Sequence, residues 1–154
     1  MESMASIQRF RLIYASRPAG SPDPDEILSI LETARRKNKT GDVTGLLYFN
    51  RRTFLQAIEG TREAVNQLFQ CISRDPRHTD VTLLFYAAIQ SRAFSDWAMA
   101  YLVENAATEA ALRRFDSSGE PLDLCQLSEW DAAGVIDVLK PFATGEASTS
   151  VPTR

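Results

Sequence analysis

The stretch VTGLLYFNRRTFLQAIEG, residues 43–60, contains two strand-like runs on either side of Arg51-Arg52. Apolar, aromatic and β-branched residues dominate both runs, which is typical of strands buried in a sheet. We therefore predict an antiparallel hairpin with strands over 43–50 and 53–60, although its turn lacks the favoured Asn-Gly.

Gln56 stands out within this hairpin because strand alternation places it on one face between Phe54 and Ile58. A buried amide without hydrogen-bond partners costs about 1–3 kcal/mol. Three explanations remain open at this point. Backbone or water satisfies the amide, this face of the strand is exposed, or the amide binds a ligand.

The sequence on both sides of the hairpin predicts further strands and helices. In chain order these are a strand over 7–16, a helix over 26–39 capped by Asp23 or Asp25, the hairpin, a helix over 62–74 capped by Thr61, and strands over 81–89 and 97–103. The order βαββαββ is typical of a ferredoxin-like two-layer α+β sandwich. We expect its two helices to cover one face of the sheet.

The C-terminal part of the chain predicts a helical extension over 106–142 that docks on the other sheet face. In its last helix the expected apolar face contains Trp130, Val135, Val138 and Leu139. Residues 143–154 contain few apolar side chains, so we predict a disordered tail. The expected organisation is a main domain over 5–105, the extension and the tail.

Composition excludes several classes of function. The chain has 154 residues and a net charge of −3, which argues against a nucleic-acid binder. A single histidine, His78, excludes zinc sites with two histidine ligands, and Cys71 with Cys125 cannot form a disulfide framework. No apolar run resembles a signal peptide or a membrane span. We expect a cytoplasmic protein that is not an enzyme, because no nucleotide-binding or nucleophile motif occurs.

Four further side chains are unusual for their predicted positions. Tyr14 faces the same way as Leu12 on the first strand, either as a core tyrosine or as a second polar group beside Gln56. Asn38 ends the first helix, where it either caps the helix or points its amide into the same cavity. Trp97 and Met99 are two residues apart on the last predicted strand, so we expect them to point the same way, as core residues or as a pair that repacks.

These segments together resemble the BLUF family of flavin-binding blue-light sensors, from about Gln8 to Leu102. The resemblance rests on the order and spacing of RLIYAS (11–16), ILSILETARRKNK (27–39), VTGLLYFN (43–50), FLQAIEG (54–60), RDPRH (74–78) and FSDWAM (94–99).

The resemblance implies a noncovalent flavin between the two helices, usually FAD, with FMN and riboflavin as alternatives. It implies photoactive roles for Tyr14 and Gln56 and a signal-relay role for Trp97 and Met99. Its further implied flavin-binding residues are Asn38 at the C4 carbonyl edge, Ile30 and Ile72 on the two ring faces, Asp75 near the pyrimidine end, and Lys37 near the phosphates or ribityl chain. Cys71 departs from the family, because some members place an arginine there.

The resemblance also implies a mechanism and an output. Light drives an electron and then a proton from Tyr14, the proton passing through Gln56, whose amide is left rotated or tautomerised. About fifty residues follow the sensor, too few for a cyclase or phosphodiesterase, so we expect a separate downstream protein partner and a homo-oligomer. The alternatives are a small flavin-dependent reductase and a ligand-free ferredoxin-like interaction module.

Overall fold

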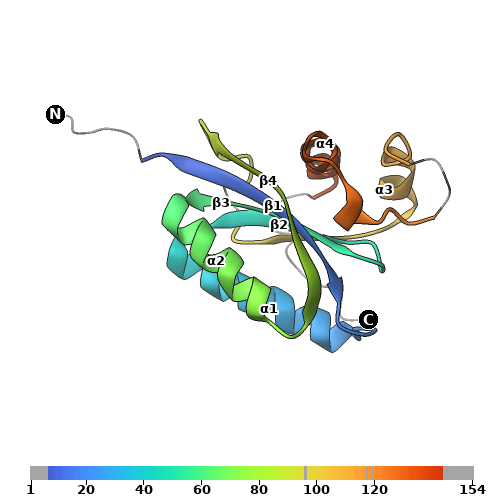
Figure 1. Cartoon of the computed structure of the whole chain (residues 1–154), viewed down its shortest axis with the longest axis horizontal. Coiled ribbons are helices and arrows are strands. Elements are labelled where there is room, and N and C mark those ends of the chain that lie inside the picture. Colours follow the sequence, from blue (N-terminus) through green and yellow to red (C-terminus); the bar gives the residue numbers. More distant parts are fainter. Residues whose placement is uncertain (1–6, 96, 117, 119, 144–154) are drawn as a thin grey trace.

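A mixed sheet of five strands, in the order β4-β1-β3-β2-β5, forms the centre of the computed structural model (Figure 1). The model describes residues 7–95, 97–116, 118 and 120–143. The strands are β1 (Arg9–Pro18), β2 (Thr44–Phe49), β3 (Phe54–Thr61), β4 (His78–Ile89) and β5 (Ala100–Val103). Strand β5 runs parallel to β2, whereas the other neighbouring pairs are antiparallel. This arrangement confirms the predicted α+β ferredoxin-like fold.

Strand boundaries differ from the predicted ones at one end of the sheet. Strand β1 extends to Pro18 and β4 begins at His78, because Pro18 pairs with His78 and Arg17 pairs with Thr79. The Pro- and Asp-rich loop after β1 therefore begins at a later residue than composition predicts. Strand β5 is shorter than predicted and begins only at Ala100.

Helices α1 (Pro24–Gly41) and α2 (Arg62–Arg74) cover one face of the sheet, as predicted (Figure 1). Helix α1 begins at Asp23, which forms a capping box with Glu26, so Asp23 rather than Asp25 is the cap. Helix α2 begins at Thr61, whose hydroxyl accepts a hydrogen bond from the backbone N–H of Ala64.

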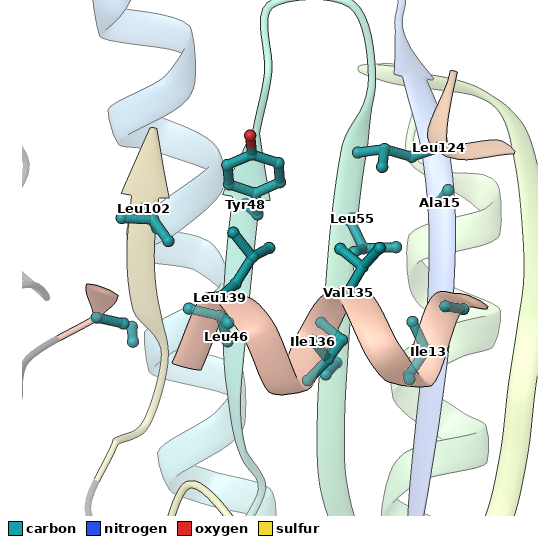
Figure 2. Close-up of a cluster of buried hydrophobic side chains, with 14 of the residues drawn as sticks. Ile13, Ala15, Leu46, Tyr48, Leu55, Leu102, Leu124, Val135, Ile136 and Leu139 are labelled. Atoms are coloured by element: carbon teal, nitrogen blue, oxygen red, sulfur yellow. The ribbon is translucent and has the colours of Figure 1, made fainter. Parts of the chain in front are cut away.

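The opposite face is covered by the C-terminal part of the chain. Its elements are α3 (Ala106–Ala111), η1 (Leu124–Gln126), α4 (Glu129–Leu139) and η2 (Lys140–Phe142). Helix α4 lies across the strands with Val135, Ile136 and Leu139 turned toward the sheet (Figure 2). The sheet thus has a second apolar core, and the extension docks where the sequence predicts.

Trp130 does not belong to the buried face of α4, which corrects the sequence prediction. Its side chain is 79% exposed, whereas Val135 and Leu139 are fully buried. The buried positions are Ala132, Val135, Ile136 and Leu139, which follow the i, i+3, i+4, i+7 pattern of one helix face, and Trp130 lies on another side of the helix. An apolar surface shared by Trp130 and Val135 therefore does not exist in the protein.

The ends of the predicted segments are only partly covered by the described residues. Ala143, which the sequence assigns to the tail, is buried in the core beneath α4. Residues 144–154 of the predicted tail lie outside the described residues, as do residues 5 and 6 of the predicted main domain. None of the helices among the described residues has the length and apolarity needed to cross a membrane.

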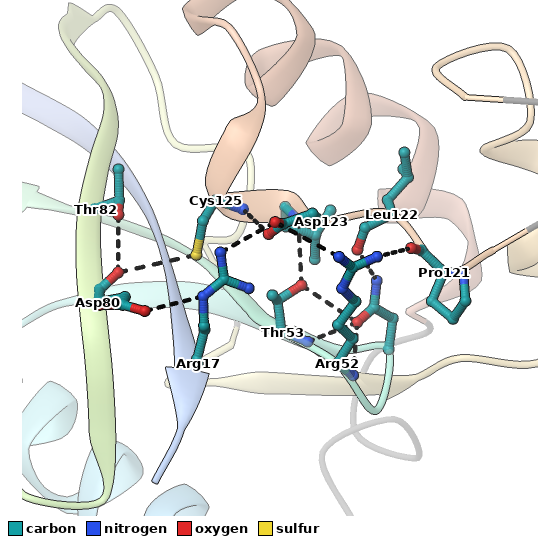
Figure 3. A network of polar contacts seen from close by, with 11 residues as sticks. Arg17, Arg52, Thr53, Asp80, Thr82, Pro121, Leu122, Asp123 and Cys125 are labelled. Atoms are coloured by element: carbon teal, nitrogen blue, oxygen red, sulfur yellow. Dashed lines mark hydrogen bonds and ion pairs between the residues drawn. The ribbon is translucent and has the colours of Figure 1, made fainter. Parts of the chain in front are cut away.

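Polar contacts fasten the segment before α4 to the strand ends (Figure 3). The guanidinium of Arg17 on β1 contacts the carboxylates of Asp80 and Asp123, each at 3.0 Å. On the β2–β3 turn, Asn50 donates to the backbone oxygen of Leu122. These partly exposed contacts fix the orientation of the extension more than they add to stability.

A buried carboxylate, Glu59 on β3, joins three parts of the fold. Its Oε2 lies 2.7 Å from the guanidinium of Arg11 on β1. Its Oε1 accepts hydrogen bonds from the backbone N–H groups of Ala93, at 2.8 Å, and Phe94, at 3.2 Å. Because Glu59 is fully buried, these partners stabilise its charge. Glu59 in turn holds the β4–β5 connection at Ala93 and Phe94.

Replacing Glu59 with Gln is expected to lower the free energy of unfolding by about 3 kcal/mol, because Arg11 then lacks its buried counter-charge. Chemical denaturation measures this change. Asp42→Asn makes the same carboxylate-to-amide change at a side chain that is 77% exposed and pairs with Arg92. That control is expected to change stability by less than about 1 kcal/mol. Equal effects of the two variants would contradict the role given to Glu59.

Candidate functional site

A cleft lies between α1 and α2 and reaches down to the sheet. Its walls come from both helices, from β1, β2 and β3, and from the end of α2. The lining residues are Tyr14, Ile30, Thr33, Ala34, Lys37, Leu47, Gln56, Leu68, Cys71, Ile72, Asp75, Arg77 and His78. The structure therefore brings together most of the predicted site residues, which are far apart in the sequence.

Tyr14 and Gln56 meet at the floor of this cleft. They are direct cross-strand partners in the β1–β3 register, and both side chains are buried. The Tyr14 hydroxyl donates a hydrogen bond to Oε1 of Gln56. The Gln56 amide nitrogen in turn donates to the sulfur of Met99 at 3.5 Å. The phenol, the amide and the thioether thus form one continuous chain of contacts.

The phenol of Tyr14 is held in its neutral, hydrogen-bond-donating form. Burial raises the pKa of Tyr14 far above its usual range, and the nearby Asp75 carboxylate raises it further. The phenol keeps its proton at neutral pH for this reason.

Asn38 lies in the last turn of α1 and is not its cap, because the helix continues to Gly41 and Asp42 is the C-cap residue. Its backbone oxygen accepts a hydrogen bond from Val43 N–H at the end of α1, and its side chain is fully buried. The amide nitrogen donates to the backbone oxygen of Ala98. Among the described residues, Oδ1 has no hydrogen-bond partner. A buried amide oxygen of this kind fits a ligand that carries an N–H group.

The remaining walls are apolar, with charged groups at the ends. Ile30 on α1 and Ile72 on α2 line the cleft from opposite helices, which suits a flat ring between them. At one end Asp75 is bonded by the Arg77 guanidinium, with one contact at 2.6 Å, and this bonding lowers the pKa of the Asp75 carboxyl. Cys71 also lines the cleft and is exposed.

A second hollow lies between the C-terminal part of α1 and α2 and shares Lys37, Leu68 and Cys71 with the cleft. Arg36 and Lys37 give it a positive character. A ligand whose ring fills the cleft can therefore extend an anionic tail past these two cations.

Trp97 and Met99 do not point the same way, which corrects the sequence prediction. Both lie in irregular backbone before β5, where the backbone N–H of Trp97 donates to the oxygen of Phe94. Met99 is fully buried in the core beneath α1 and α2, whereas Trp97 packs against the core beneath α4. Strand alternation does not apply to irregular backbone, so spacing alone gave the wrong relative orientation.

His78 is a cleft residue that sequence reasoning missed. Its Nδ1 lies 2.9 Å from the hydroxyl of Ser16, and its ring lies edge-on to Phe54. All three side chains are buried. Pairing of β1 with β4 brings Ser16 and His78 together, and no local motif reports that pairing. Within the described part of the chain, no cluster of His, Cys, Asp or Glu is arranged to hold a metal ion.

Comparison with known sequences decides the family. The profile of the family described as BLUF, "Sensors of blue-light using FAD", matches residues 10–100, well over half of the chain. The chain belongs to the BLUF family. BLUF domains are flavin-binding photosensors, which places the chain among sensors rather than among enzymes.

Curated relatives extend far beyond the matched region. The photoactivated adenylate cyclase subunit beta of Euglena gracilis is 37% identical over 105 residues, which are 68% of this chain and 12% of that protein. The blue light- and temperature-regulated antirepressor BluF of Escherichia coli (strain K12) is 35% identical over 83 residues, 54% of this chain and 21% of that protein. The chain therefore spans only a small part of the length of these relatives.

Solved structures of similar size share the whole architecture. The ground state of BlsA aligns with a TM-score of 0.79 and 25% identity, covering 95% of each chain. The dark-state structure of the BLUF protein BlrB aligns with a TM-score of 0.65 and 35% identity, covering 82% of this chain and 97% of that one. The C-terminal extension is thus included in the likeness to BlsA.

A flavin ring fits the groups that this BLUF domain presents. Within the described part of the chain the buried Asn38 oxygen lacks a partner, and the Gln56 amide nitrogen donates to the weakly accepting sulfur of Met99. A flavin offers carbonyl oxygens and an N–H on its polar edge, which complement these two amides. The apolar faces supplied by Ile30 and Ile72 match the faces of the ring.

His78 is expected to titrate below its usual pKa of 6.5, because burial lowers the pKa of its ring. His78 is the single histidine of the chain, so NMR of its ring protons measures the midpoint directly. Since the unfolded chain binds the proton more readily, the free energy of unfolding should fall as the pH drops below 6.5. This fall should be smaller in a His78→Gln variant. A native midpoint at or above 6.5 would contradict the prediction.

Proposed function

We propose that this BLUF domain is a blue-light photoreceptor in which Tyr14 and Gln56 form the photoactive pair. The observation that carries the proposal is the buried hydrogen bond from the Tyr14 hydroxyl to the Gln56 amide, on the floor of a cleft between two helices. Tyr14 is a neutral phenol that can supply both an electron and a proton. Gln56 is a group that can change its hydrogen bonds without leaving its place.

We assign the flavin contacts to residues that line the cleft or are buried beside it. Ile30 and Ile72 hold the ring between the helices, and the free oxygen of Asn38 accepts from the N–H on its polar edge. Asp75 sits near the pyrimidine end, where it also raises the pKa of Tyr14. Lys37, which lines both the cleft and the second hollow, faces the ribityl chain or the phosphates.

When bound, the flavin supplies the absorption of blue light and a short-lived oxidising power. Tyr14 then gives up an electron, followed by its hydroxyl proton, which passes to Gln56. Both the electron and the proton return to Tyr14, so there is no net oxidation. The Gln56 amide remains rotated or tautomerised. Its changed hydrogen bonds shift the absorption of the flavin slightly to the red.

A changed Gln56 amide alters its contact with Met99, the residue that precedes β5. Trp97, two residues earlier, packs on the opposite side of the sheet beneath α4. The tripeptide that carries both side chains therefore touches both cores. We infer that it relays the signal from the cleft to the C-terminal extension, as a switch requires contacts that differ between two states.

The output is proposed to be a separate protein partner, acting in the cytoplasm, with a homo-oligomer as a second possibility. Support for an effector comes from relatives in which BLUF segments occur in larger proteins, such as a bacterial light-regulated adenylyl cyclase, 31% identical to this chain. In this chain α4 presents the exposed Trp130 beside the exposed acids Glu129 and Asp131. These side chains are the surface on α4 that a partner meets.

Replacing Tyr14 with Phe is expected to abolish the red-shifted state, because the phenol proton and the Gln56 partner are lost together. Replacing Gln56 with Leu should do the same. The measurement is the absorption spectrum of the flavin-bound protein before and after blue light. Tyr86→Phe, which removes a hydroxyl from a half-buried tyrosine on β4, serves as the control. A normal photocycle in Tyr14→Phe would refute the mechanism.

The same sample separates the other functions. A yellow protein that NADPH bleaches, without a light-induced shift, would favour a flavin-dependent reductase. A colourless protein that binds no added flavin would favour a ligand-free interaction module.

We further propose that the natural cofactor is FAD, because Arg36 and Lys37 line the hollow where an anionic tail would lie. A double variant with alanine at both positions is expected to weaken FAD binding by roughly tenfold, since exposed ion pairs are each worth up to about 1 kcal/mol. Riboflavin, which lacks phosphate, should bind both proteins alike. Fluorescence titration measures both affinities.

Lys39→Ala, which removes an exposed cation from the last turn of the same helix, is the matched control and should change neither affinity. Equal loss of FAD and riboflavin binding in the double variant would show that Arg36 and Lys37 do not bind the phosphates.

A further inference from the structure

The tripeptide Trp97–Met99 is held by its backbone carbonyl groups rather than by a sheet. The oxygen of Trp97 accepts from the backbone N–H of Gly45 on β2 at 3.1 Å. The oxygen of Ala98 accepts from the Asn38 side chain, and the oxygen of Met99 accepts from Nε of Arg35 at 3.1 Å. Three consecutive carbonyl groups are thus bound, two of them by side chains of α1.

The two α1 side chains lie one helical turn apart and differ in their surroundings. Asn38 is buried beside the cleft and keeps one amide oxygen for a ligand. Arg35 is half-buried and is not among the residues that line the cleft. Its bond to Met99 has a charged donor, which makes it stronger than a neutral hydrogen bond.

Met99 is also the residue whose sulfur accepts from the Gln56 amide nitrogen. Its backbone is bound by Arg35 while its side chain contacts Gln56 in the buried core. A rotation of the Gln56 amide moves its nitrogen away from this sulfur or back toward it. How easily the Met99 side chain moves therefore affects how easily the Gln56 amide rearranges.

We propose that Arg35 is a positioning residue for Gln56: by binding the backbone oxygen of Met99, it fixes the Met99 sulfur against the Gln56 amide and slows the return of the light-induced state. The proposal rests on the proposed photoreceptor function. It adds a residue that is not among those that line the cleft. It predicts an effect on the recovery rate that leaves the red shift itself intact.

The first experiment needs no light. In flavin-bound protein kept dark, amide hydrogen exchange at Gly45 reports how often the Trp97 oxygen leaves its partner. Loss of a hydrogen bond from a charged donor should increase this exchange about tenfold in Arg35→Ala. Lys39→Ala, which removes an exposed cation from the same helix, should leave it unchanged. Amides of the β1–β3 ladder serve as the internal reference for global unfolding.

The second experiment measures dark recovery after blue light. Arg35→Ala should recover about tenfold faster than the wild-type protein, with the same red shift, because Met99 is then no longer held by Arg35 and moves more easily. In a Met99→Ala background, the same Arg35 substitution should add nothing, since no sulfur remains to be positioned. Arg35→Gln keeps a neutral donor and should lie between wild type and alanine, which also provides a milder variant for folding.

Unchanged Gly45 exchange in Arg35→Ala and Arg35→Gln would overturn the proposal. So would recovery that is unchanged or slower, or an acceleration that persists in full in the Met99→Ala background. If the wild-type protein shows no red shift, the proposed photoreceptor function fails. The exchange experiment then still decides whether Arg35 holds the tripeptide.

Discussion

The pairing of Tyr14 with Gln56 across the centre of the sheet is the interaction on which the site depends. Both polar side chains are buried between neighbouring antiparallel strands, and each satisfies part of the other's hydrogen-bonding capacity. A slip of one residue in the β1–β3 register would turn one of them to the opposite face. The hairpin, the two helices and the interior positions of β1 and β3 in the sheet all help to keep this register and to bury the pair.

The same alternation gives the sheet two distinct cores. Leu12, Tyr14 and Gln56 face α1 and α2, whereas Ile13, Ala15 and Leu55 lie beneath α4 (Figure 2). Residues that alternate along one strand share one backbone, so a displacement of β1 or β3 moves side chains on both faces of the sheet. The thickness of a single sheet separates Tyr14 and Gln56 from the extension. Contacts from Arg17 to Asp123 keep that extension in a fixed orientation (Figure 3).

The connection between β4 and β5 is the exception to this regular architecture. Its start is held by the buried Glu59 carboxylate, and its end is held by Gly45 and two side chains of α1. Polar groups from three elements thus take the place of a strand ladder. A segment held by a few separate bonds can rearrange locally, while the ladder of β1 and β3 stays intact.

Local periodicity was enough to predict much of this protein. Alternation placed Tyr14 and Gln56 on one face, capping residues located both helices, and the order of elements gave the ferredoxin-like sheet. Periodicity failed at Trp97 and Met99, which lie in irregular backbone before β5 and point to opposite cores. It also wrongly placed Trp130 on the buried face of α4, and it gave no information on the Ser16–His78 pair or on the bond from Arg35 to Met99. Those features depend on which distant elements pack together, and packing is decided by the complete set of long-range contacts rather than by any short stretch of sequence.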